Sequence, residues 1–83
     1  MYKVLLSKQP VKFLYKSPEE ISNRIKSKLK LSKENPFYYL EHFEGESYYK
    51  LRIGEYRALI DIDFEQKCLY FRVLEHGKKV YKK

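Results

Sequence analysis

Three basic residues that alternate along one predicted β-hairpin form the group best suited to chemistry. Lys50 and Arg52 alternate in the stretch YYKLRI, and Arg57 follows in EYRALIDI. Between the two stretches, Gly54-Glu55 has the composition of a two-residue type II′ turn. That turn places Arg52 directly opposite Arg57, with Lys50 two residues along on the same face. Two guanidinium forks and one point charge on a rigid sheet suit a phosphodiester and the extra negative charge of its transition state.

The net charge of the chain leaves two interpretations of this group open. Like charges directly opposite each other destabilise a pair of strands. The two arginines therefore either extend into water, as on an ordinary solvated basic face, or bind an anion. The chain has 18 Lys and Arg against 11 Asp and Glu, a formal net charge of +7. This excess favours a polyanionic partner: nucleic acid, an anionic membrane or an acidic protein.

A second set of polar groups follows closely after the last predicted strand. His76 can move a proton near neutral pH, and Tyr81 can act on a 2′-hydroxyl or stack on a base. Without a role in chemistry, His76 is an ordinary surface residue in a turn, and Tyr81 is an aromatic residue that packs at the edge of the sheet. Lys78 and Lys79 add positive charge between them. If this constellation cleaves RNA, the 2′-hydroxyl is the nucleophile and the mechanism is metal-independent acid–base catalysis.

Other chemistries find little support in the residue types. One cysteine, Cys68, excludes an internal disulfide, and we expect it to be a small core or edge residue. His42 and His76 are far apart in the sequence, so we predict no metal site and no cofactor. A lone cysteine fits a reducing compartment, and no apolar run approaches the roughly 18–20 residues of a membrane span. We therefore expect a cytoplasmic protein.

The elements that position these groups follow from hydrophobic spacing and turn residues. Four segments have the composition of strands: residues 2–6, 48–53, 55–62 and 68–75. Two segments have helical spacing: residues 8–15 and 18–34. We expect Ser7 to cap the first helix, and Ser17 with Glu20 to form a capping box at the start of the second.

The second helix is amphipathic. Its apolar stripe of Ile21, Ile25 and Leu29 predicts burial against the sheet, whereas Lys26 and Lys30 fall on the opposite, solvent-facing side. These two lysines are candidates for general contact with RNA.

A connector over residues 36–47 joins the helices to the hairpin, and we expect Phe37, Leu40 and Phe43 to be packed beneath it. The pattern as a whole predicts a single α+β domain: a strand, two N-terminal helices, then a three-strand antiparallel meander. The helices are expected to pack on the apolar face of the sheet. A cationic face is then left open to solvent.

The central string YYKLRIGEYRALIDI resembles the signature of the RelE/ParE superfamily of toxin–antitoxin toxins. The match runs position by position from Tyr49 to Arg57. Leu40 and Gly45 resemble the lead-in of that signature, and HGKKVY in the tail resembles the ending of the family. The order of the predicted elements agrees as well, so the resemblance covers nearly the whole of residues 1–83.

The resemblance implies a toxin that cleaves mRNA, in RelE-type members within the ribosomal A site. It also implies a RelB-like antitoxin that covers or distorts the basic face, so we expect a monomer or a toxin–antitoxin hetero-oligomer without a membrane partner. Carried over to this sequence, the catalytic residues are Lys50, Arg52, Arg57, His76, Lys78, Lys79 and Tyr81.

The implied roles divide this set in three. Arg57 and Lys50 stabilise the phosphate, Tyr81 or His76 assists the 2′-hydroxyl, and the tail lysines protonate or steady the leaving oxygen. Gly77 stands where the family has an arginine, so a lysine must supply that charge.

A second departure concerns Tyr48, which occupies a position that is often a strand lysine and which we retain as an RNA contact. The alternative function is a ParE-like or catalytically degenerate binding module. Such a module inhibits another target such as gyrase, or only binds antitoxin or RNA.

Overall fold

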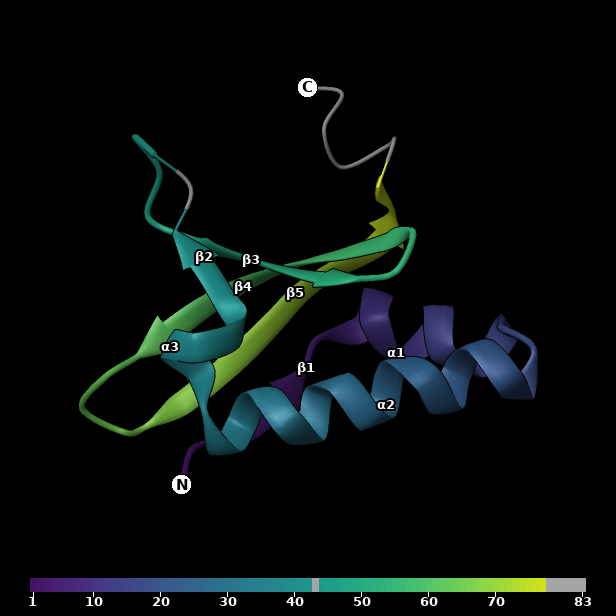
Figure 1. The fold of residues 1–83 in the computed structure, drawn as a ribbon, viewed down its shortest axis with the longest axis horizontal. Coiled ribbons are helices and arrows are strands. Elements are labelled where there is room, and N and C mark those ends of the chain that lie inside the picture. The colour runs from purple at the N-terminus through teal and green to yellow at the C-terminus, as the bar shows by residue number, and fades with distance from the viewer. Residues whose placement is uncertain (43, 78–83) are drawn as a thin grey trace.

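The chain forms one mixed sheet with its two long helices on one side (Figure 1). A computed structural model describes residues 1–42 and 44–77. In chain order the elements are β1 (Lys3–Leu6), α1 (Lys8–Lys16), α2 (Glu19–Glu34), α3 (Pro36–Tyr39), β2 (Leu40–His42), β3 (Tyr49–Ile53), β4 (Tyr56–Asp63) and β5 (Cys68–His76). The predicted α+β class, with two N-terminal helices before an antiparallel meander, is confirmed. Within the described residues, no helix is long and apolar enough to cross a membrane.

The sheet has five strands in the order β1-β5-β4-β3-β2. β1 pairs parallel to β5, and the other neighbours are antiparallel. The predicted hairpin register is confirmed, because Arg52 pairs with Arg57 and Ile53 pairs with Tyr56. Gly54 has a φ of 59°, which is the positive value that the first turn position of a type II′ turn requires.

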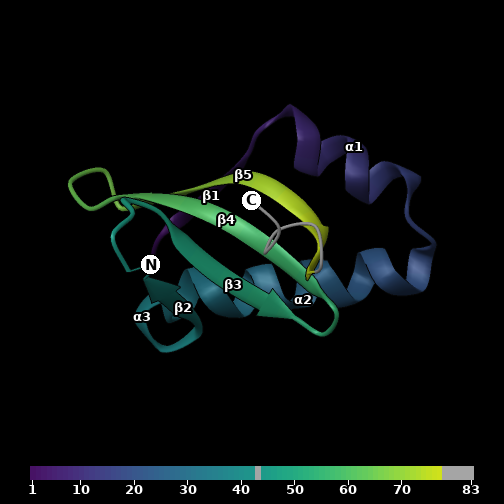
Figure 2. The ribbon, with the colours of Figure 1, turned by 90° about the horizontal axis from the view of Figure 1, so that it is seen from above.

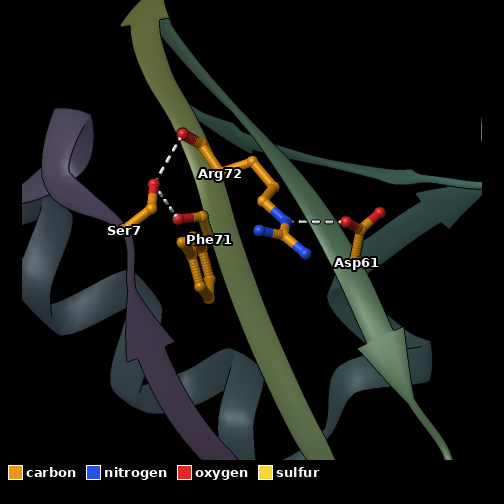
Figure 3. A network of polar contacts seen from close by, with 4 residues as sticks. All are labelled: Ser7, Asp61, Phe71 and Arg72. Atoms are coloured by element: carbon orange, nitrogen blue, oxygen red, sulfur yellow. Dashed lines mark hydrogen bonds and ion pairs between the residues drawn. The ribbon is translucent and has the colours of Figure 1, made fainter.

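β5 is held at its outer edge by hydrogen bonds that continue beyond the end of β1. The backbone N–H of Ser7 donates to the carbonyl oxygen of Phe71 at 3.0 Å. The Ser7 hydroxyl lies 3.0 Å from that oxygen and 2.8 Å from the carbonyl oxygen of Arg72 (Figure 3). The side-chain amide of Gln9 then donates to the carbonyl of Leu74 at 2.9 Å and accepts from its N–H at 2.8 Å. Gln9 thus acts as one more strand residue beside β5.

Neither predicted serine cap forms. Ser7 occupies the N-cap position of α1, but its side chain makes no capping bond because its hydroxyl is directed at β5. Ser17 donates its hydroxyl proton back to the carbonyl of Phe13 at 2.7 Å. α2 therefore begins after Pro18 as N-cap, without a side-chain cap. In both cases the serine hydroxyl donates to a backbone carbonyl and is therefore not available to cap the helix N-terminus.

The core lies between the sheet and the two helices, on the apolar face that the hairpin register predicts. Its buried side chains are Leu14, Ile25, Leu29, Leu40, Leu51, Ile53, Ala58, Ile60, Leu69, Phe71 and Leu74. Viewed from above, α2 runs beneath β3 and β4, and α1 lies along the side of β5 (Figure 2). No described helix covers the other side of the sheet, which we call the open face.

The connector differs in part from the prediction. It contains the short α3 and the edge strand β2, in which Leu40 is buried opposite Leu51, as expected. Phe37 is 63% exposed, so the prediction that it packs beneath the connector is wrong. The buried residue of α3 is Pro36, and the ring of Phe37 instead stacks on Phe64 with centroids 5.9 Å apart. The third predicted core residue, Phe43, lies outside the described residues.

We expect Gln9→Met to lower the free energy of unfolding by about 2 kcal/mol. The substitution leaves the partly buried N–H and carbonyl of Leu74 without their partner, and such unpaired groups are costly. Urea denaturation measures the change, with an m-value like that of the wild type. Lys8→Met, at the neighbouring exposed position, is the matched control and should stay within about 0.5 kcal/mol. Equal stability of the two variants would show that Gln9 does not support the edge of β5.

Candidate nucleic-acid interface

Lys50, Arg52 and Arg57, the basic cluster, lie together on the open face. Strand residues alternate between faces, and the neighbours Leu51 and Ala58 are buried on the helix side. Arg52 is exposed and pairs directly with the half-buried Arg57. The predicted placement of the cluster on one rigid hairpin is therefore confirmed.

Carboxylates are interleaved with these cations. The Nζ of Lys50 lies 3.3 Å from Oε1 of Glu41, its cross-strand neighbour on β2, and the lysine side chain is only 14% exposed. On β5, Glu75 pairs with Arg57. Arg52 is exposed and has no ion-pair partner among the described residues. The open face carries the predicted cations, with carboxylates set between them.

A β-bulge adds one more ion pair to this face. The register between β4 and β5 shifts between Leu59 and Ile60, which leaves Arg72 without a cross-strand partner. A bulge redirects the side chain of the extra residue. The Nε of Arg72 lies 2.7 Å from Oδ2 of Asp61 across the strands (Figure 3). Arg72 is thereby a further cation on the open face that sequence analysis did not single out.

The guanidinium of Arg57 is anchored at the hairpin turn. Its Nη1 donates to the carbonyl oxygens of Tyr56 at 3.1 Å and of Gly54 at 3.3 Å. The backbone N–H of Gly77 donates to the carbonyl of Glu55 at 2.7 Å, which brings the end of β5 against the same turn. A Cβ at position 77 would lie 3.2 Å from Cζ of Arg57. Because Gly77 has no side chain, the guanidinium of Arg57 can occupy this position without a steric clash.

His76 lies at the end of β5 beside the same turn. Its Nε2 is 3.1 Å from Oε1 of Glu55. Its cross-strand partner is Tyr56, and the two rings meet edge to face with centroids 5.6 Å apart. Since Tyr56 belongs to the helix-covered side of the hairpin, His76 flanks the basic cluster at its turn and does not lie among Lys50 and Arg52.

Near the cluster, the described groups that can exchange protons are His76 and the carboxylates of Glu41 and Glu75. Tyr70 pairs with Asp61, and its pKa is raised, first by a hydrogen bond to Cys68 and by the charge of that thiol. Burial and Asp63 raise it further, whereas Arg72 lowers it. A tyrosine that holds its proton so firmly is a poor general base at neutral pH. Among the described residues, no group of three or more His, Cys, Asp or Glu side chains is arranged to hold a metal ion.

Solved structures identify this arrangement of strands and helices. A chain of the RelBE2 toxin–antitoxin complex from Mycobacterium tuberculosis is 22% identical, with a TM-score of 0.79 over 90% of this chain and 96% of that one. The RelB–RelE complex from Methanococcus jannaschii gives 27% identity and a TM-score of 0.69 over 94% and 95%. The chain has the RelE fold. The isolated RelE toxin of E. coli, at 16% identity, matches with a TM-score of 0.78 over 93% and 85%.

The RelE resemblance stated from the sequence is confirmed at the level of structure. No family model matches the chain, and no curated protein matches it either. The structural matches therefore carry the assignment.

Within the RelE fold, the predicted site residues fall into separate places. Arg52, Arg57 and His76 lie next to the hairpin turn, and Lys50 lies two residues further along β3. Tyr48 is half-buried and directly precedes β3. Lys26 and Lys30 are exposed on α2, on the other side of the sheet (Figure 2), so the structure does not bring them to the cluster. Three predicted residues lie outside the described part of the chain: Lys78, Lys79 and Tyr81. The roles of all these residues stay predictions.

We expect Gly77→Ala to destabilise the protein by about 1 kcal/mol, at the low end for overpacking, since the new Cβ would crowd both Arg57 and the carbonyl of Glu55. Removing the guanidinium with Arg57→Ala relieves part of this crowding. The double variant should therefore be more stable than the sum of the single effects by about 0.5 kcal/mol or more. Urea denaturation of the full cycle measures the coupling. Lys12→Ala, on the exposed side of α1, is the control. Its effect on the free energy of unfolding should add to that of Gly77→Ala without coupling.

Proposed function

We propose that this protein is the toxin of a toxin–antitoxin system and that it cleaves mRNA on the ribosome. The observation that carries the proposal is the pair Arg52 and Arg57, set directly opposite each other on the open face of a RelE fold. Two guanidinium groups held side by side on a rigid sheet fit the oxygens of a phosphodiester. A small domain with an open face suits a substrate that a larger assembly holds in place.

In the proposed reaction, the RNA supplies its own nucleophile. The 2′-oxygen attacks phosphorus and loses its proton to neutral His76 or to Tyr81 in its phenolate form, while the bond from phosphorus to the 5′-oxygen breaks. Lys78 or Lys79 protonates or steadies that leaving oxygen. Arg57, with its guanidinium already oriented by the turn carbonyls, stabilises the charge that develops on the phosphoryl oxygens.

The carboxylates around the cluster determine how RNA approaches. Glu41 forms an ion pair with Lys50, and Glu75 is the cross-strand partner of Arg57, so both carboxylates repel phosphates there. Arg52 is exposed and has no ion-pair partner in the described part of the chain, so the backbone of the RNA meets it first. Lys26, Lys30 and Tyr48 then serve general contacts with RNA away from the cut. Binding should be strongly salt-dependent, as phosphate contacts are.

The proposed partner is a RelB-like antitoxin in the cytoplasm. Several of the similar structures are complexes of RelE with RelB, among them those from M. tuberculosis, Pyrococcus horikoshii and M. jannaschii. By analogy, an acidic segment of the antitoxin covers the basic cluster and so competes with RNA. The toxin is then inactive while the complex persists.

A binding module without nuclease activity is the second candidate. Two observations favour it: the cations of the open face are partly neutralised, and Gly77 replaces the arginine expected by resemblance. In that case the protein inhibits a target such as gyrase, or only binds antitoxin or RNA.

Mapping of mRNA 5′ ends after induced expression separates the two candidates. A nuclease gives codon-phased cuts in translated messages, and Arg57→Ala should reduce them by about 10²-fold or more, the usual cost of losing one preorganised electrostatic contact. Lys12→Ala, an exposed residue of α1, is the control and should cut like the wild type. Arrest of DNA replication with intact messages would instead establish the second candidate.

Tyr81→Phe tests the proposed proton transfer. Removing only the hydroxyl should lower the cleavage rate in a ribosome-based assay by 10²-fold or more, whereas the affinity for ribosomes should change little, since the aromatic ring remains. Unchanged cleavage would show that the Tyr81 hydroxyl takes no part in the proton transfer. His76 would then be the remaining proton acceptor, and His76→Gln tests that role.

A further inference from the structure

We propose that a small cleft beside the basic cluster binds one nucleobase of the RNA, and that it favours adenine or cytosine over uracil. This inference rests on the proposed function and adds a second contact to it. The cleft, which we call the base cleft, has a volume of about 250 Å³. It lies between α1 and the end of the hairpin and is lined by Gln9, Phe13, Tyr56, Glu75 and His76.

The size and walls of the base cleft suit a single planar ring system. Drug-sized ligands occupy pockets of roughly 300–1,000 Å³, so about 250 Å³ is room for a smaller group. Three of its five lining residues are aromatic. Tyr56 meets Phe13 and His76 edge to face, with centroids 5.8 Å and 5.6 Å apart. All three rings are partly exposed, so ring surface remains for stacking of a base.

The polar groups of the base cleft provide selectivity. Gln9 uses one N–H and one lone pair of its amide on the backbone of Leu74, which fixes the orientation of the amide. The remaining N–H and lone pair of that amide point away from each other, so the amide offers a base single contacts only. A carboxylate accepts from the amino group of cytosine, and the amino group of adenine can donate to it in the same way. Glu75 is the lining carboxylate. Uracil carries no amino group and cannot make this contact.

The base cleft adjoins the proposed phosphate site. Tyr56 precedes Arg57 in β4, and Glu75 is the cross-strand partner of Arg57 in β5. Paired residues in an antiparallel sheet have Cα atoms about 5 Å apart. Tyr56 and His76 lie on the helix-covered side of the hairpin and Arg57 on the open face. An RNA backbone that passes round the end of the sheet can therefore place a base in the cleft and a neighbouring phosphate on Arg57. The cleft thus determines which base stands beside the cut.

Titration of the protein with free nucleosides tests the cleft without the phosphate. Adenosine, cytidine and uridine are added to ¹⁵N-labelled protein, and NMR reports the backbone amides of Phe13, Leu74 and His76. Stacking and one hydrogen bond predict affinities in the millimolar range for adenosine and cytidine. Uridine should bind at least about 5-fold more weakly, since one hydrogen bond is worth roughly 1 kcal/mol. Absence of shifts, or equal binding of all three, overturns the proposal.

Three variants assign the binding to this cleft. Phe13→Leu should abolish the shifts, and Glu75→Gln should reduce the preference for cytidine, because the amide offers a weaker acceptor than the carboxylate. Phe37→Leu, which changes an exposed phenylalanine on α3, is the matched control and should bind like the wild type. A folded amide spectrum is required of each variant. Binding that persists in both Phe13→Leu and Glu75→Gln places the nucleoside elsewhere and overturns the assignment.

Cleavage mapping separates this inference from the proposed function. If the wild type cleaves mRNA, Phe13→Leu should keep cutting but lose the base preference at one position beside the cut. An unchanged preference contradicts the base cleft and leaves the nuclease intact. If the wild type does not cleave, the proposed function fails, and the nucleoside titration still decides whether the cleft binds a base. If the cleft instead accommodates a side chain of the antitoxin, the titration shows no nucleoside binding and the proposal is overturned.

Discussion

The fold depends on the parallel pairing of β1 with β5, which joins the beginning of the described chain to its end. Ser7 and Gln9 extend this pairing along β5 after β1 has ended, so α1 is attached to the sheet by main-chain and side-chain bonds as well as by packing. β5 in turn pairs with β4 along its other edge and carries Arg72, Glu75 and His76. Without the β1–β5 pairing, β5 would have an open edge and α1 no fixed place.

The electrostatics of the open face follow from the same sheet. Arg52 and Arg57 face each other, an arrangement that an isolated hairpin would not favour. The sheet compensates it: the turn carbonyls hold the guanidinium of Arg57, and neighbouring strands bring Glu41 and Glu75 into register with the cluster. The cations are therefore oriented before any ligand arrives, which lowers the ordering cost of binding a phosphate.

Local patterns could be predicted from the sequence, and contacts between distant segments could not. The hairpin register and the buried stripe of α2 followed from alternation and turn chemistry within a few residues. The partners of Ser7 and Gln9 are more than 60 positions away, and no spacing rule relates them. For the site, the sequence placed the basic cluster correctly but gave no sign of its counter-charges. It noted Gly77 as a departure without indicating that Arg57 lies against it.

The distance along the chain between the two parallel strands affects how the protein is made. Gln9 meets its partner Leu74 across a separation of 65 residues. A growing chain emerges from its N-terminus, so β1 and α1 are complete long before the strand that receives them. Closing so long a loop is slow compared with forming local structure. The hairpin turn with Arg57 is synthesised before β5, and the basic cluster reaches its final form only when β5 has joined the sheet.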